Sequence, residues 1–146
     1  METHKIEDLD QFIRLWTSIY TDQGKVDWSH ILPYYHENIF FKDCIQEIRG
    51  IEEFTAMTER LTGRSKNLSF LIHSSAMVEN RIYMEWEMII AYKKYPSSSV
   101  YGSSRLTLED GKIMEQRDYY DLWGDIFDNI PFMHKRYRRF MKKKFG

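Results

Sequence analysis

Asp118 is the residue whose type and position best suit acid–base chemistry in this sequence of 146 residues. It lies in a stretch where a period of two predicts a strand with Gln116 and Tyr120 on the same face. The same period places Trp86 and Met88 together on one face of an earlier strand. If both faces turn inward, the Asp118 carboxylate lies in an aromatic and methionine-rich cavity. Desolvation there raises its pKa toward a value useful for proton transfer.

An ion pair between Asp118 and the adjacent Arg117 is the structural alternative to this hypothesis. Neighbouring residues along a strand point to opposite faces of the sheet, so these two side chains do not pair easily. We therefore favour a role in the pocket for Asp118. Trp86 and Met88 transfer no protons, and we interpret them as lining or core residues.

The sequence has no arrangement typical of a metal or cofactor site. Its five histidines are scattered, and its one cysteine, Cys44, stands alone, so there is neither a His-x-x-x-His pair nor a cysteine cluster. No glycine-rich phosphate-binding motif is present. We predict no metal and no cofactor. The single cysteine also excludes an intrachain disulfide and fits a reducing compartment.

Length and composition favour one globular domain over residues 1–146. With 42% hydrophobic residues the chain is long enough for one core and too short for two. A formal net charge of -1 argues against nucleic-acid binding and against acidic disorder. The first ten residues are polar and acidic, and no apolar run approaches the ~20 residues that a membrane-spanning helix needs. A cytoplasmic location is the simplest interpretation.

The first half of the chain predicts three helices and a short strand. Apolar residues at three- and four-residue spacing, Trp16 among them, predict a helix over residues 6–20. Asp27 is placed to cap a second, short helix that ends near residue 35 and that Pro33 distorts. Residues 38–43 read as a strand. Gly50 then opens a helix that stops near residue 63.

From residue 68 onward the period changes from that of a helix to that of a strand. Alternating apolar residues predict four long strands, joined by turns at 79–80 and 109–111, over residues 68–78, 82–92, 100–108 and 112–121. Helices followed by a run of antiparallel strands predict an α+β fold.

Two local motifs resemble those of the SnoaL-like, or nuclear-transport-factor-2-like, superfamily. One is the stretch from Tyr35 to Asp43, a tyrosine and a short hydrophobic strand ending in an aspartate, followed by Gly50 and its helix. The other is residues 106–113 running into 117–122, which is similar to the last hairpin of limonene-1,2-epoxide hydrolase. The resemblance implies a cone-shaped fold in which a curved antiparallel sheet and N-terminal helices enclose one apolar pocket.

The resemblance to the epoxide hydrolase carries over only in part. Asp118 matches the catalytic aspartate of its last strand, whereas its arginine and second aspartate fall on Trp86 and Met88. The tyrosine and asparagine that help to hold its water fall on Phe41 and Asp43. Without these groups little remains to activate a hydrolytic water at neutral pH. We therefore expect no epoxide hydrolysis by that mechanism.

Resemblance to ketosteroid isomerase gives a different assignment. Its proton-shuttling aspartate follows a tyrosine by eight residues, as Asp43 follows Tyr35 here. Tyr20 and Ser104 fall near the positions of its two oxyanion donors, although serine is the weaker donor. For Asp43, capping of the following turn is an equally good interpretation. Resemblance to SnoaL-type polyketide cyclases asks only for an aspartate in the last strand, which Asp118 supplies.

Together these observations predict a SnoaL-like protein that binds a small lipophilic molecule and isomerises, cyclises or hydrates it. The catalytic candidates are Asp118 and, secondarily, Asp43. The candidate substrate-binding residues are Trp16, Tyr20, Tyr35, Phe41, Trp86, Met88, Ser104, Gln116 and Tyr120. Resemblance also implies a homodimer. The competing hypotheses are a non-catalytic ligand-binding or dimerisation module and a protein that acts through its basic C-terminal helix.

Residues 124–146 are predicted to form a basic, amphipathic helical extension of the domain. Seven lysines and arginines fall between positions 135 and 144, whereas the first 134 residues carry 22 acidic against 14 basic residues, a net charge of -8. We favour a helix that packs on the domain or covers the mouth of the cone. The alternative is docking to an anionic membrane surface or an acidic partner. Nucleic-acid binding is disfavoured because the basic residues are confined to one short segment.

Overall fold

The computed structural model describes residues 3–20, 25–92, 97–126 and 130–146. Its regular elements combine three α-helices with six strands, which confirms the predicted α+β class. The helices are α1 (Leu9–Ser18), α2 (Ile51–Arg64) and α3 (His134–Phe145). The strands are β1 (Tyr35–Lys42), β2 (Glu47–Arg49), β3 (Ser65–Val78), β4 (Arg81–Tyr92), β5 (Ser98–Glu109) and β6 (Lys112–Tyr120).

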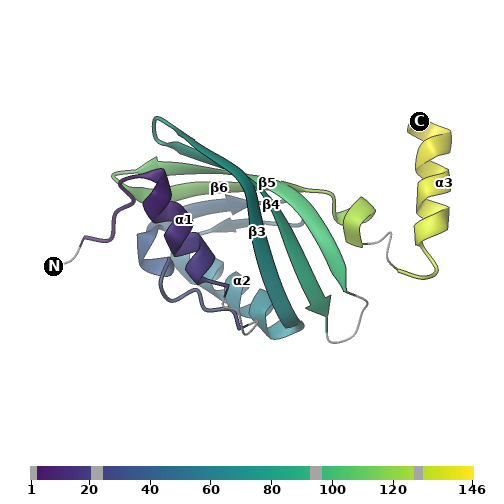
Figure 1. The fold of residues 1–146 in the computed structure, drawn as a ribbon, viewed down its shortest axis with the longest axis horizontal. Coiled ribbons are helices and arrows are strands. Elements are labelled where there is room, and N and C mark those ends of the chain that lie inside the picture. The colour runs from purple at the N-terminus through teal and green to yellow at the C-terminus, as the bar shows by residue number, and fades with distance from the viewer. Residues whose placement is uncertain (1–2, 21–24, 93–96, 127–129) are drawn as a thin grey trace.

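All six strands form one curved, open sheet in the order β2-β1-β6-β5-β4-β3 (Figure 1). The β3–β4 and β5–β6 hairpins turn where the sequence predicts, with Glu79, Asp110 and Gly111 at positive φ. Neighbouring strands are antiparallel except β1 and β6, which run parallel. The sheet is therefore mixed, whereas the family resemblance implied an antiparallel one.

Helix α1 begins with a side-chain cap and packs one apolar face on the sheet. The Asp8 carboxylate accepts a hydrogen bond from the Gln11 backbone N–H at 2.7 Å, which satisfies one of the unpaired donors of the first turn. Phe12 and Trp16, four residues apart, are the buried side chains of this helix. Both α1 and α2 lie against the same face of the curved sheet (Figure 1).

The core is the space between these two helices and the sheet. Phe12 and Trp16 of α1 and Phe54 of α2 belong to one buried cluster with the inward side chains of the strands. Along β4 the even-numbered residues Ile82 and Met84 are buried, whereas the odd-numbered residues face outward. The predicted period of two therefore assigns the inner face of the sheet correctly.

Residues 27–34 do not form the short α-helix that the sequence predicts. The Asp27 carboxylate accepts from the Ser29 backbone N–H at 2.9 Å and closes a turn. A 3-10 helix, η1 (Leu32–Tyr34), follows, and β1 begins directly at Tyr35. Pro33 at the start of η1 explains the difference, because proline lacks the N–H that a continuing α-helix needs.

The C-terminal helix stands apart from the layered body. A π-helical turn, η2 (Leu122–Ile126), follows β6, and α3 then extends away from the sheet (Figure 1). None of the residues in α3 is buried, so this helix adds no side chain to the core. In the described part of the chain, no helix combines the length and the apolar character needed to cross a bilayer.

Candidate functional site

The inner face of β4, β5 and β6 presents Asp118 beside two buried residues. In the sheet register Asp118 lies opposite Ser104, and Ser104 lies opposite Met84. Ser104 and Met84 are each only 2% exposed, whereas Asp118 keeps part of its surface accessible to solvent. Asp118 is thus a half-buried residue set among core residues.

Two neighbouring side chains donate hydrogen bonds to the Asp118 carboxylate. Ser104 Oγ lies 2.6 Å from Asp118 Oδ1. Gln116 Nε2 lies 3.2 Å from Oδ1 and 3.3 Å from Oδ2. Oδ1 thus receives the short contact and Oδ2 only a long one, so Oδ2 keeps more capacity to accept a proton.

The direction of these hydrogen bonds is fixed by two buried aromatic residues. Trp86 Nε1 donates to Ser104 Oγ at 2.8 Å, and because an indole N–H only donates, the single hydroxyl proton of Ser104 points to Asp118. Tyr35 Oη donates to Gln116 Oε1 at 2.7 Å, which turns the amide nitrogen toward Asp118. Ser104 and Gln116 therefore both donate hydrogen bonds to Asp118, and these bonds stabilise its ionised carboxylate.

Burial nevertheless dominates the electrostatics of Asp118. Desolvation raises the pKa of its carboxyl from 3.8 to about 6. The hydrogen bonds from Ser104 and Gln116 lower this pKa, the Asp43 carboxylate raises it, and the Arg117 guanidinium lowers it. Asp118 is therefore mostly ionised at neutral pH but takes up a proton one unit below, as a general base must.

Aromatic rings form the wall around this carboxylate. Trp86 lies between Phe70 and Tyr120, with ring centroids 5.3 and 6.1 Å away. Phe70 also stacks on Tyr20 at 5.0 Å and meets Trp16 edge-on at 5.7 Å. Helix α1, Tyr20 two residues after its end, and the sheet thus contribute to one aromatic surface.

Asp43 lies just beyond the end of β1 and is held by its own turn. Its Oδ1 accepts from the backbone N–H groups of Ile45 and Gln46 at 2.8 and 2.9 Å. Its Oδ2 accepts from Tyr120 Oη at 2.9 Å. Of the two interpretations left open by the sequence, the contacts match the turn cap. Asp43 also positions the Tyr120 ring beside Trp86.

The remaining predicted site residues lie on the same inner face. Phe41 is the sheet neighbour of Gln116 and packs on Phe54. Met88 lies between Phe70 and Val100 in the register, partly buried. In contrast to Ser104 and Gln116, these two residues bring apolar surface and no polar group.

Two tyrosines near Asp118 are neutral across the physiological range. Desolvation and the charge of Asp118 raise the pKa of Tyr20 far above its ordinary value of 10.0. The same two causes, with Tyr20 adding to them, raise the pKa of Tyr35. Both phenols therefore keep their protons, and Tyr35 donates its proton to Gln116.

Sequence reasoning missed two residues that shape the site. Phe70 was expected in a strand, but its contacts with rings from α1 and β4 required the three-dimensional fold. Gly102 lies opposite Trp86 in the register, and a Cβ at this position would come within 2.4 Å of the indole ring. A glycine within a strand is the signal for such a close approach.

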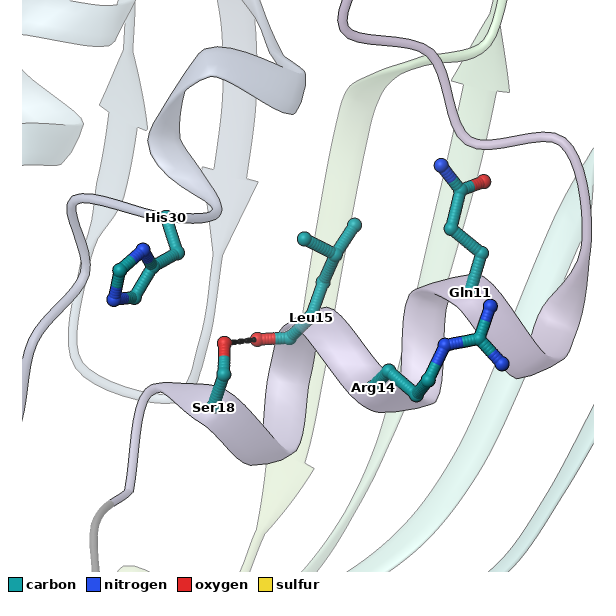
Figure 2. A pocket seen from close by; sticks show the side chains of 5 residues that line it. All are labelled: Gln11, Arg14, Leu15, Ser18 and His30. Atoms are coloured by element: carbon teal, nitrogen blue, oxygen red, sulfur yellow. Dashed lines mark hydrogen bonds between the residues drawn. The ribbon is translucent and has the colours of Figure 1, made fainter.

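Two hollows in the described part of the molecule lie away from Asp118. One, of about 350 Å³, lies on the outer side of α1 and is lined by Gln11, Arg14, Leu15 and Ser18 together with His30 (Figure 2). The other, of about 450 Å³, lies between residues 26–32 and α2. The enclosed apolar pocket around Asp118 stays a prediction.

No cluster of metal-binding side chains occurs among the described residues. Groups of three or more histidine, cysteine, aspartate or glutamate side chains able to hold an ion are absent from this part of the chain. The candidate chemistry therefore consists of one carboxylate, its two donor chains and the aromatic wall.

Comparison with known proteins shows which family model and which solved structures this chain resembles. The family model described as a SnoaL-like domain matches residues 9–116, and no curated protein sequence gives a significant match. A putative SnoaL-like polyketide cyclase from Jannaschia sp. CCS1 has 16% identity and a TM-score of 0.68, with 90% of this chain and 96% of that chain covered.

Two further solved structures share the fold. A protein with a ketosteroid isomerase-like fold from Catenulispora acidiphila, solved with trimethylamine, has 14% identity and a TM-score of 0.70 over 84% of this chain and 93% of that chain. An LEH-like epoxide hydrolase from M. tuberculosis has 15% identity and a TM-score of 0.67 over 88% and 93%. With the family model matching most of its length, this chain belongs to the SnoaL-like domain family.

Proposed function

We propose that this protein binds a small hydrophobic molecule on the inner face of its sheet and moves a proton with Asp118, as a cofactor-independent isomerase or cyclase. The observation that carries the proposal is a half-buried aspartate whose carboxyl pKa is raised to about 6 beside an aromatic wall. Proteins that share this fold include a putative polyketide cyclase and an LEH-like epoxide hydrolase, which supports a catalytic use of this face.

In this proposal Asp118 Oδ2 takes the proton from the substrate. Oδ1 is engaged by Ser104 at 2.6 Å, whereas Oδ2 has only the long contact from Gln116. A carboxyl group that is ionised at neutral pH and holds a proton near pH 6 both accepts and returns that proton within one turnover.

The substrate class follows from the groups around the carboxylate. Aromatic and methionine side chains favour an apolar molecule, and a base suits a C–H bond made acidic by an adjacent carbonyl. Tyr20 is the donor that we assign to the developing enolate oxygen, because its phenol stays protonated near Asp118.

Hydrolysis of an epoxide fits this site less well. Met84 and Trp86 are the inward residues of β4 nearest to Asp118 in the register, and neither orients or activates a water molecule. The polar groups that contact Asp118, Ser104 and Gln116, are both used to hold the carboxylate. Proton transfer within the substrate needs no water and is therefore the favoured reaction.

Deuterium incorporation from D2O into small aromatic ketones, followed by NMR, tests the proposal. We expect the wild-type protein to accelerate exchange at the carbon next to the carbonyl. Asp118→Asn, which keeps the shape of the side chain, should lose this acceleration by about 100-fold or more. The matched control is Asp110→Asn in the exposed β5–β6 turn, where asparagine tolerates the positive φ of 51°.

Exchange that persists in Asp118→Asn would refute the role of this residue. Ligand binding without exchange in the wild-type protein would instead identify a binding module. Trp fluorescence quenching by the same ketones measures binding independently of turnover, because Trp16 and Trp86 both lie in the aromatic wall.

A further inference from the structure

Helix α3 combines a strongly basic face with an exposed apolar one. Seven lysines and arginines lie between residues 135 and 144, and no acidic residue occurs after position 128. With ~100° of rotation per residue, Tyr137, Phe140 and Met141 share one side of the helix. Most of the basic residues occupy the opposite side, with the last lysine, Lys144, beside the apolar stripe.

The apolar side of this segment is poorly covered by the rest of the molecule. Phe140 is 55% exposed and Phe145 is 78% exposed, and Phe132 in the preceding turn reaches 88%. Isolated exposed hydrophobic residues are ordinary, but three phenylalanines within 14 residues form an exposed group. The fold of the body does not account for their exposure.

Contacts between α3 and the body concentrate on η2. The Tyr137 ring stacks on Trp123 with centroids 5.9 Å apart, and Arg138 Nη2 donates to the Gly124 carbonyl oxygen at 3.3 Å. Trp123 is itself 50% exposed, so the stacked pair continues the apolar surface of the helix. The SnoaL-like match ends at residue 116, before this whole segment.

We propose that α3, with Phe132 and Trp123, docks this protein on an anionic lipid bilayer. Aromatic side chains at the level of the headgroups with lysines and arginines around them are the two features that hold an amphipathic helix in a membrane interface. Long basic side chains reach past the apolar stripe to the headgroups, so Lys144 beside that stripe is compatible with this position.

A lipid surface fits better than a nucleic acid or an acidic protein groove. Phosphate backbones attract the basic residues but leave the phenylalanines in water, whereas a bilayer interface takes up both faces. The first 134 residues carry a net charge of -8. This negative charge repels a nucleic acid that extends from α3 over the rest of the protein. A bilayer that meets only the projecting helix avoids much of this repulsion because salt screens charges beyond ~10 Å.

Co-sedimentation of the full-length protein with phosphatidylcholine vesicles, with and without phosphatidylserine, tests this proposal. We expect binding to the phosphatidylserine vesicles alone, and its loss as the salt concentration is raised. Neutralising Lys142, Lys143 and Lys144 to glutamine should lower the partition coefficient by about 100-fold, at roughly fivefold per charge.

The apolar contribution is tested separately. Phe140→Ala combined with Phe145→Ala should lower partition into the same vesicles by about tenfold or more. Its matched control is Ile45→Ala, an apolar residue with 61% exposure in the turn after β1, which should bind as the wild type does. For the charges, the control neutralises the exposed Arg14, Arg60 and Arg64 of α1 and α2 and should also keep binding.

Three results would overturn the membrane proposal. One is an intact protein that does not bind phosphatidylserine vesicles at low salt. Another is equal binding by the triple-glutamine variant whose circular dichroism matches the wild type. The third is retention of a DNA or RNA duplex in a gel shift without vesicle binding, which would assign the basic helix to nucleic acid.

Discussion

Burial and hydrogen bonding act on the Asp118 carboxyl in opposite directions, and their balance determines its pKa. Burial disfavours the charged carboxylate, whereas the donors Ser104 and Gln116 favour it. Since Trp86 and Tyr35 fix the direction of those donors, the site is organised to receive an ionised carboxylate. The result is a pKa of about 6, between that of an ordinary aspartate and that of a permanently protonated one.

This balance predicts how stability depends on pH. The folded-state pKa of Asp118 is raised to about 6 from 3.8 in the unfolded chain, so the folded state binds the proton more tightly. The favourable contribution is complete below about pH 4 and is lost as the pH rises through 6. At pH 8 the unfolding free energy of Asp118→Asn, relative to wild type, should exceed its value at pH 4 by about 2–3 kcal/mol.

Urea unfolding of both proteins at pH 4 and pH 8 measures this difference. Any effect of the asparagine side chain that does not depend on pH is the same at both pH values and cancels. The exposed Asp110→Asn serves as the control and should follow the wild-type curve. A relative stability of Asp118→Asn that is the same at pH 4 and pH 8 would show that the carboxylate is not destabilised by burial.

For single residues, the sequence predicted which side chains share a face of the sheet with Asp118 better than it predicted the hydrogen bonds between them. A period of two brought Gln116, Tyr120 and Trp86 to the face of Asp118, because side chains alternate strictly along strands. Which donor faces which oxygen depends on angles and distances that no spacing encodes. The turn-capping contacts of Asp43 likewise follow from local backbone geometry after β1.

At the scale of elements, the contact between β4 and β5 positions Trp86. The indole lies over Gly102, which leaves room for its Nε1 to reach Ser104 two residues farther along β5. A side chain at position 102 would meet the ring at 2.4 Å and the Tyr119 carbonyl oxygen at 2.8 Å. The strand pair therefore depends on one glycine.

Gly102→Ala should displace the Trp86 ring and break its hydrogen bond to Ser104. Overpacking of this kind costs about 1–3 kcal/mol of unfolding free energy, which urea unfolding measures. Gly63→Ala in α2 is the matched control, since nothing lies within 4 Å of its added Cβ, and it should be neutral or stabilising by up to about 1 kcal/mol. Equal stability of Gly102→Ala and wild type would contradict this account of the β4–β5 contact.

The elements themselves were predictable where their periodic pattern is long. Strands of nine residues or more and the helix after Gly50 appear close to their expected positions. Strand β2 has three residues, too few to show a period, and its pairing with β1 depends on tertiary context. The 3-10 turn at Pro33 reflects the competition between an apolar helical pattern and a residue that lacks an N–H.

At the scale of the whole molecule, the outer face of the sheet exposes several large apolar and aromatic side chains among charged ones. Six such side chains have exposed fractions between 38% and 58%: Leu71, Val78, Tyr83, Ile89, Tyr101 and Tyr119. In the register Leu71 and Tyr101 lie on either side of Glu87 on neighbouring strands. Exposed apolar side chains in such numbers are typical of a protein interface. The homodimer that the family resemblance implies stays a prediction.

We predict that the protein is a dimer in sedimentation equilibrium and that Leu71→Arg with Tyr101→Arg makes it monomeric. Two buried arginines facing their copies across the interface cost several kcal/mol, enough to dissociate a dimer at micromolar concentration. Ile45→Arg, on a residue 61% exposed in the turn after β1, should leave the dimer intact. A wild-type monomer, or a double variant that still dimerises, would refute this interface.

The most direct test of the central claim is a pH titration of the Trp86 indole N–H signal in a 1H–15N spectrum. Trp86 donates to Ser104, which donates to Asp118, so the signal reports the charge of the carboxylate two hydrogen bonds away. Trp86→Phe identifies the signal. We predict an inflection at about pH 6 that disappears in Asp118→Asn. No inflection between pH 5 and 7, or one that persists in Asp118→Asn, would contradict the role of Asp118 as the proton-transfer group.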